Sequence, residues 1–125
     1  MKLFSVEEAN ALLPTVRGLL KKIQRAHRRV NLYQESARGA ASAAEQGGGG
    51  MAGGVRYAEA LMQLASLTSE LESMGIQLKD FTRGLIDFPS LREGRVVLLC
   101  WQLDEGDCVE WWHDVDAGFA GRTPL

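Results

Sequence analysis

The amino-acid sequence predicts an α+β fold, in which a long antiparallel helical hairpin precedes a small antiparallel β-sheet of three or four strands. Heptad-spaced apolar residues occupy two segments, 5–38 and 55–74, and these stripes predict the hairpin. From residue 76 to residue 113 the pattern changes to short apolar runs separated by turn residues, which is typical of a β-meander. The 125 residues, 46% of them hydrophobic, suit one soluble domain and exclude a fibrous or fully disordered chain.

The first helix is expected to begin at a capping box, Ser5-Val6-Glu7-Glu8, in which Ser5 caps the helix and Glu8 reaches back to it. Pro14 lacks an amide hydrogen and crowds the preceding turn, so we expect a short helix to end near Leu12 and Pro14 to open a second one. A kinked continuous helix is the alternative. The apolar stripe that follows consists of Val16, Leu19, Ile23, Ala26, Val30, Tyr33 and Ala37.

Residues 39–54 hold seven of the fourteen glycines and almost no core-forming residue, which predicts a flexible linker. Residues 40–46 could instead prolong the first helix. Three of these glycines match G-x-G-x-x-G, but no strand precedes them and no Lys-Ser or Lys-Thr pair follows, so no nucleotide site and no cofactor is expected.

The second helix carries a stripe of the same spacing, and Gly75 is expected to cap its end. Its members are Ala60, Leu64, Leu67, Leu71 and Met74, with Tyr57 and Leu61 widening the stripe. A lone hairpin would leave part of this wide surface exposed to water, so the sheet or a second hairpin should cover it. The sequence therefore predicts a homo-oligomer formed through the hairpin.

Four strands are expected, separated by turn signals such as Pro89-Ser90 with Glu93-Gly94. They are Ile76–Asp80, Leu85–Phe88, Arg95–Leu103 and Val109–His113. The run from Val96 to Trp101 is apolar on both faces, which indicates a central strand covered on both sides. Residues 114–125 are expected to form an irregular arm.

Candidate ligand or metal residues lie near the ends of these strands, where carboxylates and an imidazole can bind a divalent ion or transfer protons. They are Asp80, Asp87, Trp101, Glu110 and His113. No H-x-x-x-H, C-x-x-C or H-E-x-x-H motif accompanies them, so turn chemistry is the simpler interpretation and no metal is assigned. Strand alternation also turns one of the adjacent Trp111 and Trp112 away from the helices, and we expect Phe119 of the arm to cover that ring.

The two cysteines, Cys100 and Cys108, suit a reducing compartment rather than a disulfide framework. Cys100 lies in the most apolar strand, where core packing is expected rather than nucleophilic chemistry. No signal peptide and no apolar run long enough to span a membrane is visible, so we expect a cytoplasmic protein without a membrane partner.

Charge is divided unequally along the chain. Residues 1–38 hold eight lysines and arginines against three acids, a net charge of +5, and the remainder carries −7. The basic residues include a row at four-residue spacing, which should meet negative charge on the second helix or on a partner subunit. Nucleic acid is the alternative, but no aromatic residues interleave the row, whose members are Arg17, Lys21, Arg25 and Arg29. Arg122, in a glycine-containing segment of the arm, is a further anion candidate.

Six segments together resemble a bacterial family of short uncharacterised proteins, domain of unknown function 2203. They are Phe4–Pro14, Gly75–Asp80, Gly84–Pro89, Val97–Trp101, Trp111–His113 and Gly118–Arg122. The resemblance implies a small cytoplasmic bacterial protein and supplies neither an activity nor catalytic residues.

Three functions follow from these observations, in decreasing order of support. The first is a self-associating interaction or assembly module, in which burial of the apolar stripe is the mechanism. The second is a small-ligand or metal-binding protein, potentially an enzyme, with its site on the sheet. The third is a nucleic-acid accessory protein that uses the basic row.

Overall fold

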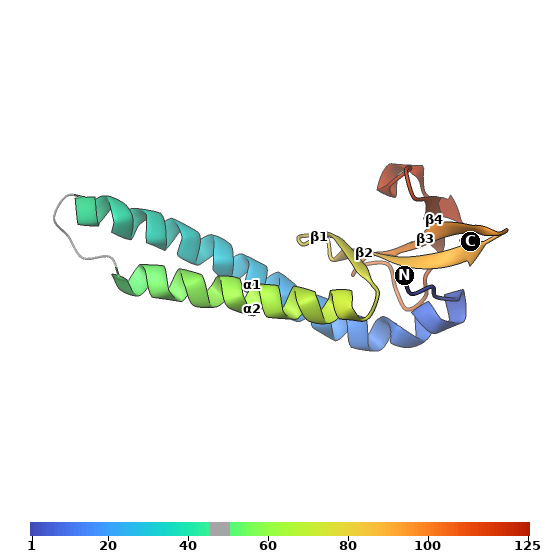
Figure 1. Ribbon diagram of the computed structural model, residues 1–125, viewed down its shortest axis with the longest axis horizontal. Coiled ribbons are helices and arrows are strands. Elements are labelled where there is room, and N and C mark those ends of the chain that lie inside the picture. Colours follow the sequence, from blue (N-terminus) through green and yellow to red (C-terminus); the bar gives the residue numbers. More distant parts are fainter. Residues whose placement is uncertain (46–50) are drawn as a thin grey trace.

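The structure, a computed structural model, describes residues 1–45 and 51–125 and shows a helical hairpin followed by a five-stranded antiparallel sheet (Figure 1). The helices are α1 (Val6–Glu45) and α2 (Met51–Ser73). The strands, hydrogen-bonded in sequence order, are β1 (Gln77–Asp80), β2 (Leu85–Arg92), β3 (Arg95–Trp101), β4 (Trp111–Asp114) and β5 (Thr123–Pro124). The predicted α+β fold is confirmed. The fifth strand comes from the arm that was expected to be irregular, because residues 123 and 124 pair with β4.

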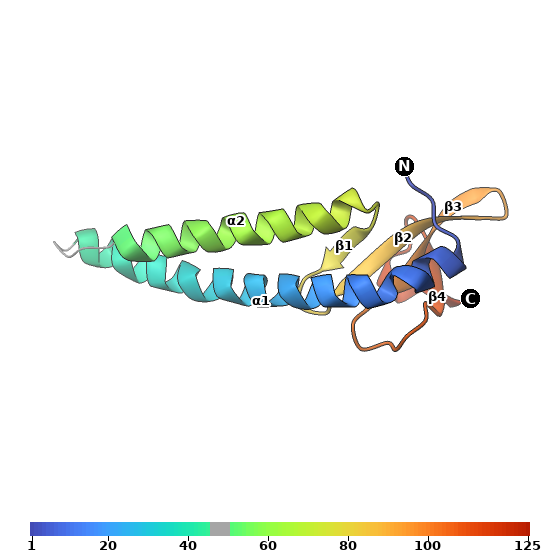
Figure 2. The same ribbon diagram turned by 90° about the horizontal axis from the view of Figure 1, so that it is seen from below.

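Helix α1 begins at the predicted capping box and continues through Pro14 without a break (Figure 2). The Ser5 amide donates to the Glu8 carboxylate, and the Glu8 amide donates to the Ser5 hydroxyl, both at 3.0 Å. The expected break at Pro14 is wrong. Leu13 and Val16 on either side are completely buried, and packing of this kind outweighs the cost of about 3 kcal/mol for an interior proline.

Both helices extend into the segment that was expected to be a linker. α1 reaches Glu45 and α2 begins at Met51, and the glycine run 47–50 lies outside the described residues. The alanine-rich composition of residues 40–44 explains the extension, because alanine has the highest helix propensity. Figure 1 shows the hairpin projecting well beyond the sheet. In the described ranges, no helix combines the length and apolarity that a membrane span requires.

Strand β2 continues through Pro89 and Ser90, which were expected to form a turn. The Pro89 carbonyl accepts a hydrogen bond of 2.7 Å from the Phe4 amide, so it points away from β3. The nitrogen of a strand residue points to the same side as its carbonyl, and the missing amide hydrogen therefore costs no bond between β2 and β3. The chain turns instead at Glu93-Gly94, where both residues have positive φ angles of 51° and 79°, as a two-residue type I′ hairpin requires.

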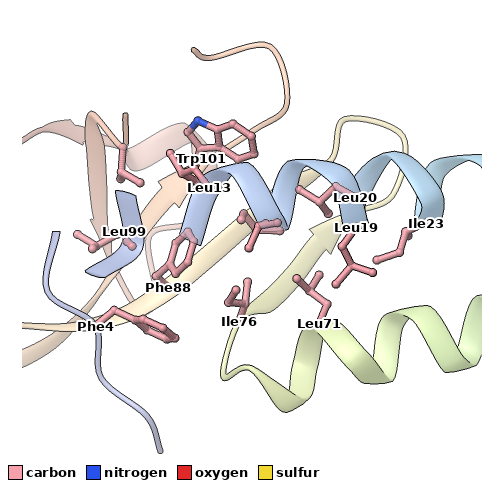
Figure 3. Close-up of a cluster of buried hydrophobic side chains, with 14 residues drawn as sticks. Phe4, Leu13, Leu19, Leu20, Ile23, Leu71, Ile76, Phe88, Leu99 and Trp101 are labelled. Atoms are coloured by element: carbon pink, nitrogen blue, oxygen red, sulfur yellow. The ribbon is translucent and has the colours of Figure 1, made fainter. Parts of the chain in front are cut away.

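The main hydrophobic core lies where α1 passes between the sheet and α2 (Figure 3). Phe88 of β2 and Leu99 and Trp101 of β3 face the helices, and Leu71 of α2 closes the far side. Residues 97–101 are buried throughout, and β3 is the middle strand of the sheet, so the predicted central strand is confirmed. The C-terminal arm lies on the sheet face opposite α1 (red in Figure 1). This second face holds the polar residues described next.

Candidate functional site

Three buried polar side chains from three adjacent strands gather on the sheet face that lies beneath the C-terminal arm. Asp87 of β2 pairs with Cys100 of β3, and Leu98 pairs with His113 of β4, so strand alternation directs all three side chains to this face. Their exposed fractions are 2%, 1% and 3%. One carboxylate oxygen, the thiol sulfur and one imidazole nitrogen all lie within 4.8 Å of one another.

The hydrogen bonds of His113 define its chemical state. Its Nδ1 lies 2.8 Å from the carbonyl oxygen of Asp114, which only accepts, so Nδ1 carries a proton and donates it. Its Nε2 lies 3.1 and 3.2 Å from the two carboxylate oxygens of Asp87, which also only accept when ionised. A neutral imidazole has one donor, so the contact between Nε2 and an ionised carboxylate needs one further proton or a metal ion. A proton on Nε2, a proton on the Asp87 carboxyl group or a bound metal ion fulfils this requirement.

Cys100 is a protonated thiol in the metal-free protein. Burial, reinforced by the charge of Asp87, raises the pKa of Cys100 to about 12 against the opposing effect of Arg122. His113 directs its Nε2 to the Asp87 carboxylate, so it does not serve as a base for the thiol. This environment disfavours a nucleophilic cysteine mechanism, because the reactive species of such a mechanism is a thiolate.

The C-terminal arm is fixed above this cluster by Arg122. Its Nη1 donates to both carboxylate oxygens of Glu105 at 2.9 and 2.8 Å, and both side chains are mostly buried. The guanidinium carbon also lies 4.8 Å from the centre of the Trp111 ring and 4.1 Å from that of Phe119. Trp111 is thus the outward-facing tryptophan, and Arg122 covers it where Phe119 was expected. The charge of Arg122 is balanced within the chain.

A pocket of about 190 Å³ opens onto the cluster between the sheet and the arm. Besides the cluster residues, its walls consist of four apolar side chains, one glycine and one cation: Leu85, Leu98, Val115, Phe119, Gly118 and Lys79. Lys79 lies in a β-bulge, since the register between β1 and β2 shifts between Leu78 and Asp80. Gln77 pairs with Asp87, so strand alternation already directs Lys79 to the pocket face, and the bulge changes the direction of the residue that follows it.

Of the five predicted ligand or metal residues, the structure brings only Asp87 and His113 together. Asp80 accepts a hydrogen bond of 3.1 Å from the Arg83 amide, which is the turn chemistry expected as the simpler interpretation. Trp101 is fully buried on the helix-facing side of the sheet, where its indole nitrogen donates to the Gly106 carbonyl. Glu110 precedes β4 and its side chain is exposed.

Sequence analysis missed Cys100 and Lys79 as members of the site. Cys100 and Asp87 share one signal, a polar or ionisable residue within an otherwise apolar strand. That signal becomes specific only once the strand register is known. Lys79 has no comparable signal, because a lysine in a short edge strand is common in any sheet.

The basic row of α1 is partly used inside the chain. Arg17 donates to the Gly106 carbonyl at 2.7 Å and lies 3.2 Å from the carboxylate of Asp107. Arg29 donates to the side-chain oxygen of Gln63. Lys21 and Arg25 are exposed and form no ion pair within the described ranges, so the expected pairing with the glutamates of α2 is not seen there.

The cluster offers two kinds of chemistry. Nitrogen, oxygen and sulfur ligands in one buried group suit a borderline ion such as Zn²⁺, whereas Ca²⁺ and Mg²⁺ prefer oxygen ligands alone. Without a metal, Asp87 and His113 form a buried acid–base pair that shares a proton.

Comparison with known proteins identifies one family. The chain matches the family described as "Uncharacterized conserved protein (DUF2203)" over residues 2–125. No curated protein and no solved structure matches the chain significantly.

Proposed function

Because the chain belongs to the DUF2203 family, whose description names no activity, we propose its function from the geometry: it binds one divalent transition-metal ion of the zinc class through Asp87, Cys100 and His113. The three ligand atoms already lie within 4.8 Å of one another. In a tetrahedral zinc site with bonds of 2.0–2.3 Å, ligand atoms are separated by roughly 3.3–3.7 Å. The nitrogen–oxygen contact of 3.1 Å is close to that separation, and a small shift of the sulfur completes the set.

The hydrogen-bond pattern of His113 is the observation that carries this proposal. The Nε2 atom and the Asp87 carboxylate both present lone pairs to the same point, and a metal ion accepts both. Nδ1 meanwhile donates to the Asp114 carbonyl, which is the outer contact that orients almost every metal-binding histidine. A proton on Nε2 is the competing explanation, and it predicts a buried ion pair without metal affinity.

Charge also favours a divalent cation at this site. The Asp87 carboxylate and a Cys100 thiolate together carry two negative charges, which a divalent ion neutralises, and such neutralisation stabilises a buried group. Arg122 Nη1 lies 3.9 Å from the sulfur and supports the thiolate. A reducing cytoplasm, which we propose as the compartment, keeps this thiol available.

The test measures zinc binding to purified protein stripped with a chelator, by calorimetry and by elemental analysis after gel filtration. We expect one zinc per chain. Asp87→Asn, Cys100→Ser and His113→Gln should each weaken binding at least about 100-fold, because even outer-shell contacts contribute 10–100-fold. Asn at position 87 is informative, since its amide can still donate to a neutral His113 and preserve the metal-free fold.

Matched controls use the same residue types outside the site: Asp80→Asn, Cys108→Ser and His27→Gln. Each control should retain the zinc affinity of the unmodified chain. Absence of zinc binding in the unmodified protein would overturn the proposal, as would equal losses in the site variants and the controls.

Self-association through the hairpin is a second candidate function, and a separate observation favours it. Residues 60–69 of α2 contain no charged side chain, although Leu61 and Met62 are 41% and 72% exposed. An uncharged, partly apolar helix surface on a projecting hairpin is suited to a second copy of the chain. Sedimentation should then show a dimer that Leu61→Glu weakens, whereas Leu91→Glu, at an exposed position on β2, should not. A chain that remains monomeric at high concentration contradicts this function.

A further inference from the structure

Lys79 is an exposed cation that lines the pocket. It lies beside the proposed metal-binding cluster, and strand alternation directs it to that face, because Gln77, two residues earlier, pairs with Asp87. Its ammonium group forms no ion pair with any described residue, in contrast to Arg17, Arg95 and Arg122. A lysine in this position is available to an anion that enters the pocket.

The net charge of the site with its metal also favours an anionic ligand. Three protein ligands leave one coordination position of a tetrahedral ion open, and the pocket lies on the cluster. Asp87, Cys100 as thiolate and a divalent ion sum to zero charge, so Lys79 makes the pocket positive. A neutral or cationic ligand gains nothing from this charge, whereas an anion gains two attractive contacts.

We propose that the open metal position and Lys79 together bind the carboxylate of a small ligand whose remaining atoms are apolar. This inference rests on the proposed metal site. One carboxylate oxygen occupies the open metal position, and the other accepts a hydrogen bond from the lysine ammonium. The apolar part of the ligand lies against Leu85, Leu98, Val115 and Phe119.

The walls and the volume set the class of ligand. Of the six wall residues outside the cluster, four carry large apolar side chains and one is a glycine, which disfavours a ligand that is polar throughout, such as inorganic phosphate. The volume of about 190 Å³ is below the 300–1,000 Å³ of pockets for drug-sized molecules. A short-chain or small aromatic monocarboxylate fits both constraints.

The experiment uses the full chain loaded with Co²⁺, whose visible absorption changes when a ligand enters its coordination sphere. Acetate, propionate and butyrate are titrated in turn, with phosphate and chloride as the inorganic arms. We expect the carboxylates to change the spectrum with a Kd that falls about fourfold per added methylene until the pocket is full. Phosphate and chloride should bind more weakly than butyrate.

Lys79→Met tests the role of the ammonium while retaining the length of the side chain. It should raise the Kd for butyrate about tenfold or more and leave the Co²⁺ affinity unchanged. Lys21→Met, on the exposed face of α1, is the control and should change neither value.

The possible failures are distinguishable. A chain that takes up no Co²⁺ overturns both the metal site and the carboxylate site. A chain that binds Co²⁺ but shows no spectral change with butyrate, or the same Kd after Lys79→Met, overturns the carboxylate site alone. A preference for phosphate overturns the apolar-ligand assignment.

Discussion

Replacing His113 with phenylalanine tests whether the Asp87–His113 contact is a buried charged pair. The substitution preserves the approximate shape of the ring and leaves the Asp87 carboxylate, 2% exposed, without its imidazole partner. Breaking a buried pair in this way costs about 3–5 kcal/mol. For a 125-residue domain the entropy of unfolding is about 0.26 kcal/mol/K, so a loss of 3 kcal/mol lowers Tm by about 11 °C.

The measurement is thermal and urea unfolding in the presence of a chelator, followed by tryptophan fluorescence and circular dichroism. A double variant, Asp87→Leu with His113→Phe, should recover most of the loss, because it removes both buried polar groups together. His27→Phe is the control, since His27 stacks on Phe81 and forms no ion pair among the described residues, and it should cost less than about 1 kcal/mol. The reasoning is refuted if His113→Phe stays within 1 kcal/mol of the unmodified chain or if the double variant is no more stable than the single one.

Two further predictions concern thiol reactivity and a backbone turn. In metal-free native protein at pH 8, exposed Cys108 should react with a thiol reagent within minutes, whereas Cys100 should react only after unfolding. Cys100 is buried, and its pKa of about 12 leaves roughly one thiolate in ten thousand at this pH. Two thiols that react quickly in the native protein would contradict this prediction. Gly84→Ala should lower the free energy of unfolding by about 2–4 kcal/mol in urea titrations, because φ is +60° and the new Cβ would lie 2.6 Å from the Leu103 side chain. Gly94→Ala, with φ +79° and open space around it, should cost about 1–2 kcal/mol, and equal losses at the two glycines would be the contrary result.

Local patterns in the sequence were sufficient for the elements of this fold. The capping box at Ser5 and Glu8 forms as predicted, since both of its hydrogen bonds lie within one helical turn. The glycine expected to end the second helix, Gly75, has a φ of +89°. Errors arose where a distant contact outweighed a local preference. Packing around Pro14 keeps α1 continuous, and the Phe4 amide allows Pro89 to remain within a strand.

Family membership was also readable from the sequence, because the resemblance rests on short segments spread along nearly the whole chain, and the family match covers residues 2–125. The charge asymmetry was also visible in the sequence, because it only requires counting charged residues. The partners of the basic residues were not visible, since Arg17 donates to the Gly106 carbonyl, 89 residues away. A row of cations in a sequence therefore does not show which of its members the fold has already paired.

The candidate site is a product of tertiary structure alone. Asp87, Cys100 and His113 are separated by thirteen residues at each step, and none of the short metal motifs has that spacing. They meet because β2, β3 and β4 pair in a register that places all three on one face, and a slip of one residue would turn any of them to the opposite face. The sequence determined the helices, the central strand and the family, since these follow from periodicity and local hydrogen bonding. Only the strand register and the folded arm decided where the chemistry of this protein lies.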